Sequence, residues 1–231
     1  CSEYISNAES AISASDYSAA AISYENAAEC YADDGKSTQA GSNYNLAAEA
    51  WLTAGERENA AGAYLNSAQA YKVSRPTTCG SMAILAADLY SQIASRDSQL
   101  SSYSLAMECY IRGNNNKEIT TTGKLAGDLS VAMGDISLAV EYYDTAIQYG
   151  EAGNVRALLC PVYEAQGDVL STASATYYRQ AAGNYSLAGI CYRDHDRDPS
   201  ACAQVLDKAI SSVKDRSALL SGQYYSQAGQ C

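Results

Sequence analysis

Alanine and tyrosine recur four positions apart along this chain, inside the repeated pattern Ser-Leu-Ala-x-x-x-Tyr. Clear copies lie at 104–110, 137–143 and 186–192, and looser copies lie at 18–24 and 58–64. Residues four apart share one face of an α-helix, so each alanine and its tyrosine are expected to lie in a seam between neighbouring helices. We therefore expect five buried, structural tyrosines, namely Tyr24, Tyr64, Tyr110, Tyr143 and Tyr192.

Turn signals separate these helical segments and lie mostly about 15 to 20 residues apart. That spacing leaves room for one helix at a time and none for a β-α-β unit. Examples are Asp34-Gly35, Gly134-Asp135, Gly167-Asp168 and Gly183-Asn184. The signals predict about 13 helices and no strands. We expect hairpins over roughly 1–33, 37–74, 77–113 and 116–150, followed by five shorter helices over 154–230.

The composition changes what these helices must bury. Leucine, isoleucine and valine number 17, 11 and 8, phenylalanine is absent, and the formal net charge is −11. Few large aliphatic side chains and a high net charge are typical of disordered chains. Here 20 tyrosines supply the missing area, since each ring buries a large surface while its hydroxyl stays at a wet edge. Because small alanines let helices approach closely, we expect a folded, all-α protein.

Eight cysteines form four pairs with nearly equal separations of 29, 30, 31 and 29 residues. Two helices of about four turns each, joined by a short turn, bring residues roughly 30 positions apart back side by side. The spacing therefore predicts a disulfide staple for each pair. The expected staples are Cys1–Cys30, Cys79–Cys109, Cys160–Cys191 and Cys202–Cys231.

Three alternatives to these staples stay open at the level of sequence. Cysteines also serve as small buried thiols in helical packing, and Cys191 and Cys202 flank a turn symmetrically enough to pair with each other. A lipid-modified Cys1 would leave Cys30 unpaired. Disulfides persist in oxidising compartments, so the predicted staples indicate an extracellular or cell-surface location.

Neither the charge nor the motifs of the chain indicate a nucleic-acid, membrane or enzyme function. The chain has 26 acidic and 15 basic residues and a pI of about 4.5, whereas nucleic acids and anionic lipids require clustered cations. No apolar run approaches the roughly 18 residues of a membrane span. Phosphate-loop, dinucleotide and nucleophile-elbow motifs are absent. We therefore expect no catalytic residue and no cofactor.

The single histidine, His195, lies in a polar stretch over 194–199 that contains three aspartates. A calcium loop of the EF-hand type needs glycine at its sixth position and glutamate at its twelfth, where Pro199 and Val205 stand. No cysteine lies at zinc-ligand spacing from His195. We expect no metal site, but a solvated turn in which Asp198 caps a helix that begins at Pro199.

One N-glycosylation acceptor is present, the triplet Asn184-Tyr185-Ser186, and it coincides with a predicted turn. A glycan on Asn184 is expected to fit there. The serines and the run over 120–122 offer O-glycan acceptors in an extracellular chain, although hydrophilic helix surfaces explain them equally well.

The Ala-x-x-x-Tyr-x-x-Ala pattern resembles that of tetratricopeptide repeats, in the second helix of each hairpin. The segment over 47–72 is similar to the related repeats of soluble NSF-attachment proteins. In such hairpins the first helix carries a large residue, a small one four later and an aromatic three beyond, as at Tyr44, Ala48 and Trp51. The resemblance covers about 1–192.

This resemblance implies a right-handed α-solenoid of antiparallel hairpins. We expect a single domain over 1–231, regular over 1–150 and less regular over 154–231. The attachment proteins are cytosolic adaptors that hold an acidic helical bundle with basic surface residues, whereas this chain is acidic and has six lysines. We therefore carry the resemblance over for architecture and not for activity.

Repeat arrays leave a helix face uncovered at each end unless a polar helix caps it. Here the first expected helix carries Ile5 and Ile12, and the last carries Leu219 and Tyr224. Unlike ends that bind each other make a head-to-tail contact, which propagates into a filament if it does not close. We expect a secreted structural protein that self-associates through these four residues into an extracellular fibre or surface assembly. The alternative is an adaptor that binds a partner protein in its concave groove.

Overall fold

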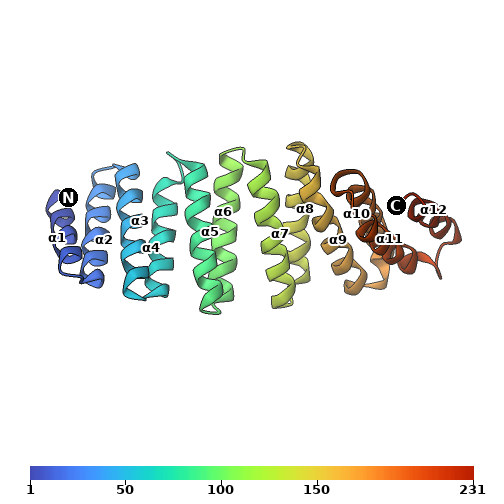
Figure 1. Ribbon diagram of the computed structural model, residues 1–231, viewed down its shortest axis with the longest axis horizontal. Helices are drawn as coiled ribbons and strands as arrows, with labels where there is room; N and C mark the ends of the chain where they lie inside the picture. The colour runs from blue at the N-terminus through green and yellow to red at the C-terminus, as the bar shows by residue number, and fades with distance from the viewer. The chain divides into compact units, whose positions relative to one another are not determined.

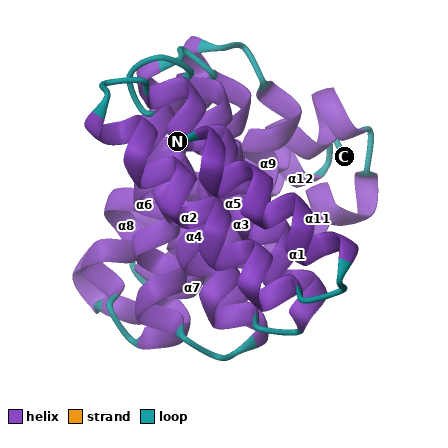
Figure 2. Cartoon of the chain, turned by 90° about the vertical axis from the view of Figure 1, so that its left-hand side faces the viewer, coloured by secondary structure: helices purple, strands orange, loops and turns teal.

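The protein is helical throughout the part that the structure describes, which is residues 1–231 except the side chain of Ala175. The computed structural model contains twelve α-helices joined by short turns, and Figure 2 shows helices and loops without a strand. The elements are α1 Ser2–Ser13, α2 Tyr17–Asp33, α3 Ser37–Ala54, α4 Arg57–Tyr71, α5 Pro76–Gln92, α6 Arg96–Arg112, α7 Asn116–Met133, α8 Ile136–Ala152, α9 Arg156–Ala173, the 3₁₀ segment η1 Ala175–Tyr177, α10 Tyr178–Cys191, the π segment η2 Tyr192–Asp196, α11 Pro199–Val213 and α12 Ala218–Ala228.

The helices form two compact units, Cys1–Asn115 with α1 to α6 and Asn116–Cys231 with α7 to α12. Within each unit every helix packs against the next one in the chain, as the colours of Figure 1 let the reader follow. Chain neighbours are therefore neighbours in space, which is the arrangement of a helical-repeat array.

The four regular hairpins expected from the sequence are confirmed by α1 to α8. The expected five short helices after residue 154 are wrong, because α9 and α10 run straight through the supposed turns at Gly167 and Gly183. Gly167 does not form a turn, and its lack of a side chain makes room for a neighbouring ring. A Cβ atom there would lie 2.8 Å from ring atoms of Tyr185, so only glycine lets that ring lie on the helix.

The second helices of the hairpins begin 40, 39 and 40 residues apart, at Tyr17, Arg57, Arg96 and Ile136. The eighth residue of each is a tyrosine buried against the first helix of the same hairpin, and α10 follows the same rule. For Tyr143 and Tyr185 the ring lies directly on a glycine of that first helix, Gly127 and Gly167. The tyrosines in this position are Tyr24, Tyr64, Tyr103, Tyr143 and Tyr185, each at most 7% exposed.

This register differs from the one expected from the repeated motif. Tyr24, Tyr64 and Tyr143 are buried as predicted, but Tyr110 lies seven residues further along α6, at its fifteenth position, and Tyr192 follows α10 as the first residue of η2. Tyr110 is buried there too, with its ring against Gly80. Tyr192 is only half-buried, so the expectation of full burial is wrong for it.

The last hairpin departs from the rule because its first helix lacks the small residue. The twelfth residue of α7 and α9 is glycine, whereas the twelfth residue of α11 is Ile210. A tyrosine ring cannot lie flat on a helix where a branched side chain already stands. The eighth residue of α12, Tyr225, is accordingly 62% exposed, and its neighbour Tyr224 packs in the core with Ile210 and Val213.

Candidate functional site

The four disulfides join the four pairs that the spacing predicts, which confirms the expected staples. Their Cα atoms lie 5.2 to 5.8 Å apart, and no described cysteine is free. The alternatives of buried thiols and of a bridge between Cys191 and Cys202 are therefore wrong. Each disulfide ties the start of a first helix to the end of its second helix.

Two hairpins have no disulfide and are held by buried hydroxyl groups. In α3 and α4, Ala40 and Ala70 stand where the next hairpin has Cys79 and Cys109, since both lie 39 residues earlier. There the Ser67 hydroxyl donates to the Gly41 carbonyl oxygen at 2.8 Å. In α7 and α8, the Thr120 hydroxyl donates to the Asn116 carbonyl oxygen of its own helix at 2.8 Å and lies 3.3 Å from the Ala146 carbonyl oxygen of α8, which makes a weaker, shared contact. A short polar cross-link thus replaces the covalent one.

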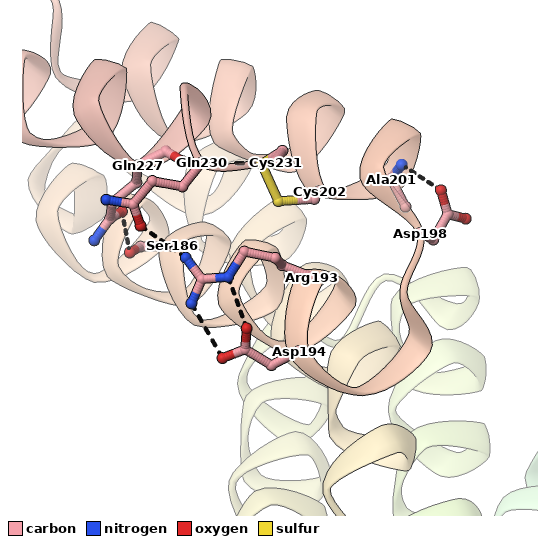
Figure 3. Close-up of a disulfide and its surroundings, with 9 residues drawn as sticks. All are labelled: Ser186, Arg193, Asp194, Asp198, Ala201, Cys202, Gln227, Gln230 and Cys231. Atoms are coloured by element: carbon pink, nitrogen blue, oxygen red, sulfur yellow. Dashed lines mark hydrogen bonds and ion pairs between the residues drawn. A yellow bond between two sulfur atoms is a disulfide. The ribbon is translucent and has the colours of Figure 1, made fainter.

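A disulfide and hydrogen bonds join α12 and the residues after it to α10, η2 and α11, as Figure 3 shows. The disulfide Cys202–Cys231 anchors the chain end to α11. The Ser186 hydroxyl donates to Gln227 Oε1 at 2.7 Å. Arg193, which is paired with Asp194 at 2.7 Å, donates to Gln230 Oε1 at 2.8 Å. These ties hold α12 in one position.

One face of this fastened helix is uncovered. Leu219 is 75% exposed, and Gly222 and Gly229 lie on the same side, with no atom of another element near Gly222. In α10 the fifth and twelfth residues are also small and face the next helix, since a Cβ on Gly189 would lie 2.7 Å from Leu206. Gly222 of α12 and Gly229, the residue that follows it, stand at the corresponding positions, and no other described helix packs on Gly222.

Of the four residues expected at the chain ends, Tyr224 is placed differently from the expectation, and the exposure of Ile12 is not specific to an end. Tyr224 is 8% exposed and belongs to the core, so it offers no surface. Ile12 is 40% exposed, but Leu52, which lies 40 residues later at the equivalent point of α3, is 38% exposed within the array. The exposure of Ile12 is therefore ordinary for this position and does not mark the chain end.

Tyr4 marks the N-terminal end more clearly than Ile5, which is half-buried. Forty residues later, Tyr44 lies partly buried, and this burial raises its pKa, with a further contribution from the charges of Glu29 and Glu25 of α2. Tyr4 holds the equivalent place on α1, where no described helix covers it, and is 42% exposed. The comparison of repeats reveals this residue, and the sequence motif alone did not select it.

The glycosylation acceptor lies inside α10 and not in a turn, so that expectation is wrong. Asn184 donates from Nδ2 to Gln166 Oε1 at 2.9 Å, and Ser186 of the same triplet is buried. A glycan would need the nitrogen that makes this bond. The folded chain therefore presents Asn184 poorly to a glycosyltransferase.

The stretch around His195 folds into η2 and a turn. Asp198 accepts a hydrogen bond from the Ala201 backbone N–H at 2.9 Å, which confirms it as the cap of the helix that begins at Pro199. Among the described residues, no three side chains of His, Cys, Asp or Glu gather as a metal site would require. Every helix of the described part is too short or too polar to cross a bilayer.

Tyrosine hydroxyls in the second unit donate to carboxylates on neighbouring helices. Tyr143 bonds Asp128 at 2.8 Å, Tyr185 bonds Asp168 at 2.8 Å, and Tyr163 bonds Glu151 at 2.7 Å. Burial of the ring, reinforced by the carboxylate, raises the pKa of each phenol. For Tyr185 the pKa rises to about 12. The acidic residues thus hold buried tyrosines in their protonated form.

We expect this network to make the protein sensitive to alkali. Below pH 10 a tyrosine is protonated in both states, and between about pH 10 and 12 only the unfolded chain loses the proton. Stability should therefore fall as pH rises, by about 3 kcal/mol for Tyr185 alone over that interval. Urea unfolding across the range checks this, and Tyr185→Phe should flatten the slope. A slope that is the same in the variant would contradict the assignment.

The comparisons with known proteins agree with this fold. No family model and no curated protein sequence matches the chain. Among solved structures, BtubC (BKLC) from P. vanneervenii aligns over 91% of this chain and 86% of its own, with 15% identity and a TM-score of 0.53. A tetratricopeptide repeat protein from Parabacteroides merdae aligns over 99% and 97%, with 11% identity and a TM-score of 0.36. The packing of consecutive helices and the alignment with BtubC confirm the expected all-helical repeat architecture.

Proposed function

We propose that the chain is a secreted or cell-surface structural protein whose copies join end to end into an extracellular fibre or surface assembly. In this arrangement α12 of one copy packs against α1 of the next. The observation that carries the proposal is the uncovered face of α12, with Leu219 75% exposed on a helix that a disulfide and side-chain hydrogen bonds hold in place.

An ordered end suits such a contact for a physical reason. Binding loses less entropy when the interface is already rigid, so a modest apolar contact yields more affinity. The faces of α1 and α12 differ, so their contact would be heterologous and would repeat from copy to copy. Four disulfides in the described chain support an oxidising location, where such an assembly would be exposed to solvent outside the cell.

The second candidate function is an adaptor that binds a partner protein along the first helices of its hairpins. Its support is an exposed leucine at the tenth residue of α3 and of α5, Leu46 at 38% and Leu85 at 39%. Three residues later each helix carries an acid, Glu49 and Asp88. A repeated apolar and acidic surface of this kind fits a partner with apolar and basic side chains.

Substitutions at the ends separate the two functions. Leu219→Glu and Tyr4→Glu should each abolish fibres of the purified protein, because a charge would be buried in every contact between copies. Val73→Glu is the matched control, since Val73 is 79% exposed at the turn after α4 and should leave assembly unchanged. Negative-stain microscopy and sedimentation give the measurement, with circular dichroism to show that each variant is folded.

Two results would contradict end-to-end assembly. One is a wild-type chain that stays monomeric at high concentration. The other is a Val73→Glu variant that loses assembly as completely as Leu219→Glu, which would point to general charge repulsion. Either result would leave the adaptor as the better supported function.

A further inference from the structure

The second unit contains a cavity of about 790 Å³, open on one side, between α8, α9, α10, η1 and α12. This volume lies within the range of pockets that hold small ligands. Its walls include the apolar side chains Val140, Leu170 and Leu187, of which Leu187 is 45% exposed. The cavity shares Tyr224 of α12 with the end helix of the proposed assembly, whereas Leu219, the exposed residue of that end contact, does not line it.

A polar relay crosses the floor of the cavity. Gln166 is 4% exposed and uses both ends of its amide. Its Nε2 donates to Asp144 Oδ1 at 2.6 Å, and its Oε1 accepts from Asn184 Nδ2 at 2.9 Å. The relay connects α8, α9 and α10 and fixes the orientation of the Asp144 carboxylate. Asp144 Oδ2 has no hydrogen-bond partner among the described residues, so one acceptor remains for a ligand.

The charged side chains that line the cavity are all acidic. Glu141 and Asp144 line it, and no lysine, arginine or histidine does. Two carboxylates elsewhere in this unit do have a cationic partner, Asp128 with Lys124 and Asp168 with Lys208. Neither Glu141 nor Asp144 makes an ion pair with a described residue. Two adjacent acids without a cation, beside apolar walls, leave an uncompensated negative site.

We propose that this cavity binds a lysine or arginine side chain of an extended peptide segment whose flanking residues are apolar. The cationic head would pair with Asp144 and Glu141, and the aliphatic stem and the flanking side chains would lie against Val140, Leu170 and Leu187. A fixed carboxylate favours such a pair, since less order is lost when the cation arrives.

The test uses a labelled, capped pentapeptide of alternating leucine and lysine, with binding followed by fluorescence anisotropy. The double variant Glu141→Gln and Asp144→Asn should bind at least about ten-fold more weakly, because it removes both charges of the site. Asparagine keeps an oxygen that accepts from Gln166, so the relay and the fold should survive. Circular dichroism and thermal unfolding of the variant check this.

Controls distinguish the site from attraction to an acidic protein in general. Asp207→Asn with Asp215→Asn removes two exposed acids outside the cavity and should leave the affinity unchanged. Peptides with glutamate in place of lysine, or glycine in place of leucine, should bind at least about ten-fold more weakly. The proposal is overturned if the leucine-lysine peptide does not bind, or if the two double variants lose affinity equally.

Discussion

Replacing Tyr143 with alanine should lower the free energy of unfolding by about 3 to 5 kcal/mol, the range for large aromatic side chains in cores. Tyr143 is 1% exposed, and its ring lies so close to Gly127 that a Cβ there would come within 2.5 Å of a ring atom. Neighbouring helices meet at this ring, so its removal leaves a cavity that rigid backbones cannot close. Urea unfolding followed by circular dichroism gives the measurement.

Two further variants show which part of the side chain carries this effect. Tyr143→Phe keeps the ring and removes only the hydrogen bond to Asp128, so it should cost about 1 to 2 kcal/mol. Tyr225→Ala removes the same side chain from a site that is 62% exposed and should cost about 1 kcal/mol or less. A loss for Tyr225→Ala as large as that for Tyr143→Ala would contradict the register described here.

Removal of the disulfide between α5 and α6 should have the next largest effect. The double variant Cys79→Ala and Cys109→Ala opens a bridge between residues 30 positions apart, which should lower stability by about 3 kcal/mol in the chain-entropy estimate. Chemical denaturation of the oxidised proteins measures the difference. Reduction of all four bridges should destabilise the wild type by more than any single pair.

The hairpin of α3 and α4 offers the inverse experiment. Ala40 and Ala70 stand at the positions that the cysteines occupy in the next hairpin, and Ala40 is fully buried. Ala40→Cys with Ala70→Cys should form a fifth bridge and raise stability by a similar amount. If the new thiols stay reduced under oxidising conditions, the two hairpins do not share the geometry that their 39-residue offset indicates.

The candidate end contact could be predicted only in part from the sequence. Leu219 was expected and is exposed, whereas Tyr224 was expected and is buried. The sequence places two tyrosines side by side at 224 and 225, and both are compatible with a helix. Which of them turns inward depends on Ile210 of α11, a residue on another helix. Successive side chains on a helix point about 100° apart. Burial of Tyr224 therefore places Tyr225 on the exposed face of α12.

No sequence pattern indicates the hydrogen bonds that connect Asp144, Gln166 and Asn184 in the cavity. Asp144, Gln166 and Asn184 lie 22 and 18 residues apart on three helices, and their types are common on helix surfaces. Asn184 was even assigned to a turn, because glycine before asparagine is a turn signal in most contexts. The surrounding helices override that local preference, and they make the asparagine part of a partly buried connection between helices.

The sequence by itself determined the helices and hairpins over residues 1–150 and indicated the cysteine partners through their spacing. These depend on local information: the periodic alanine and tyrosine, helix caps such as Asp198, and a separation of about 30 residues that brings the end of a second helix beside the start of the first. Only the tertiary structure decided which tyrosines share a position, as Tyr103 and not Tyr110 matches Tyr143. The reason is that one motif can start at different points of a helix, and the facing helix selects the register by offering a small residue under the ring.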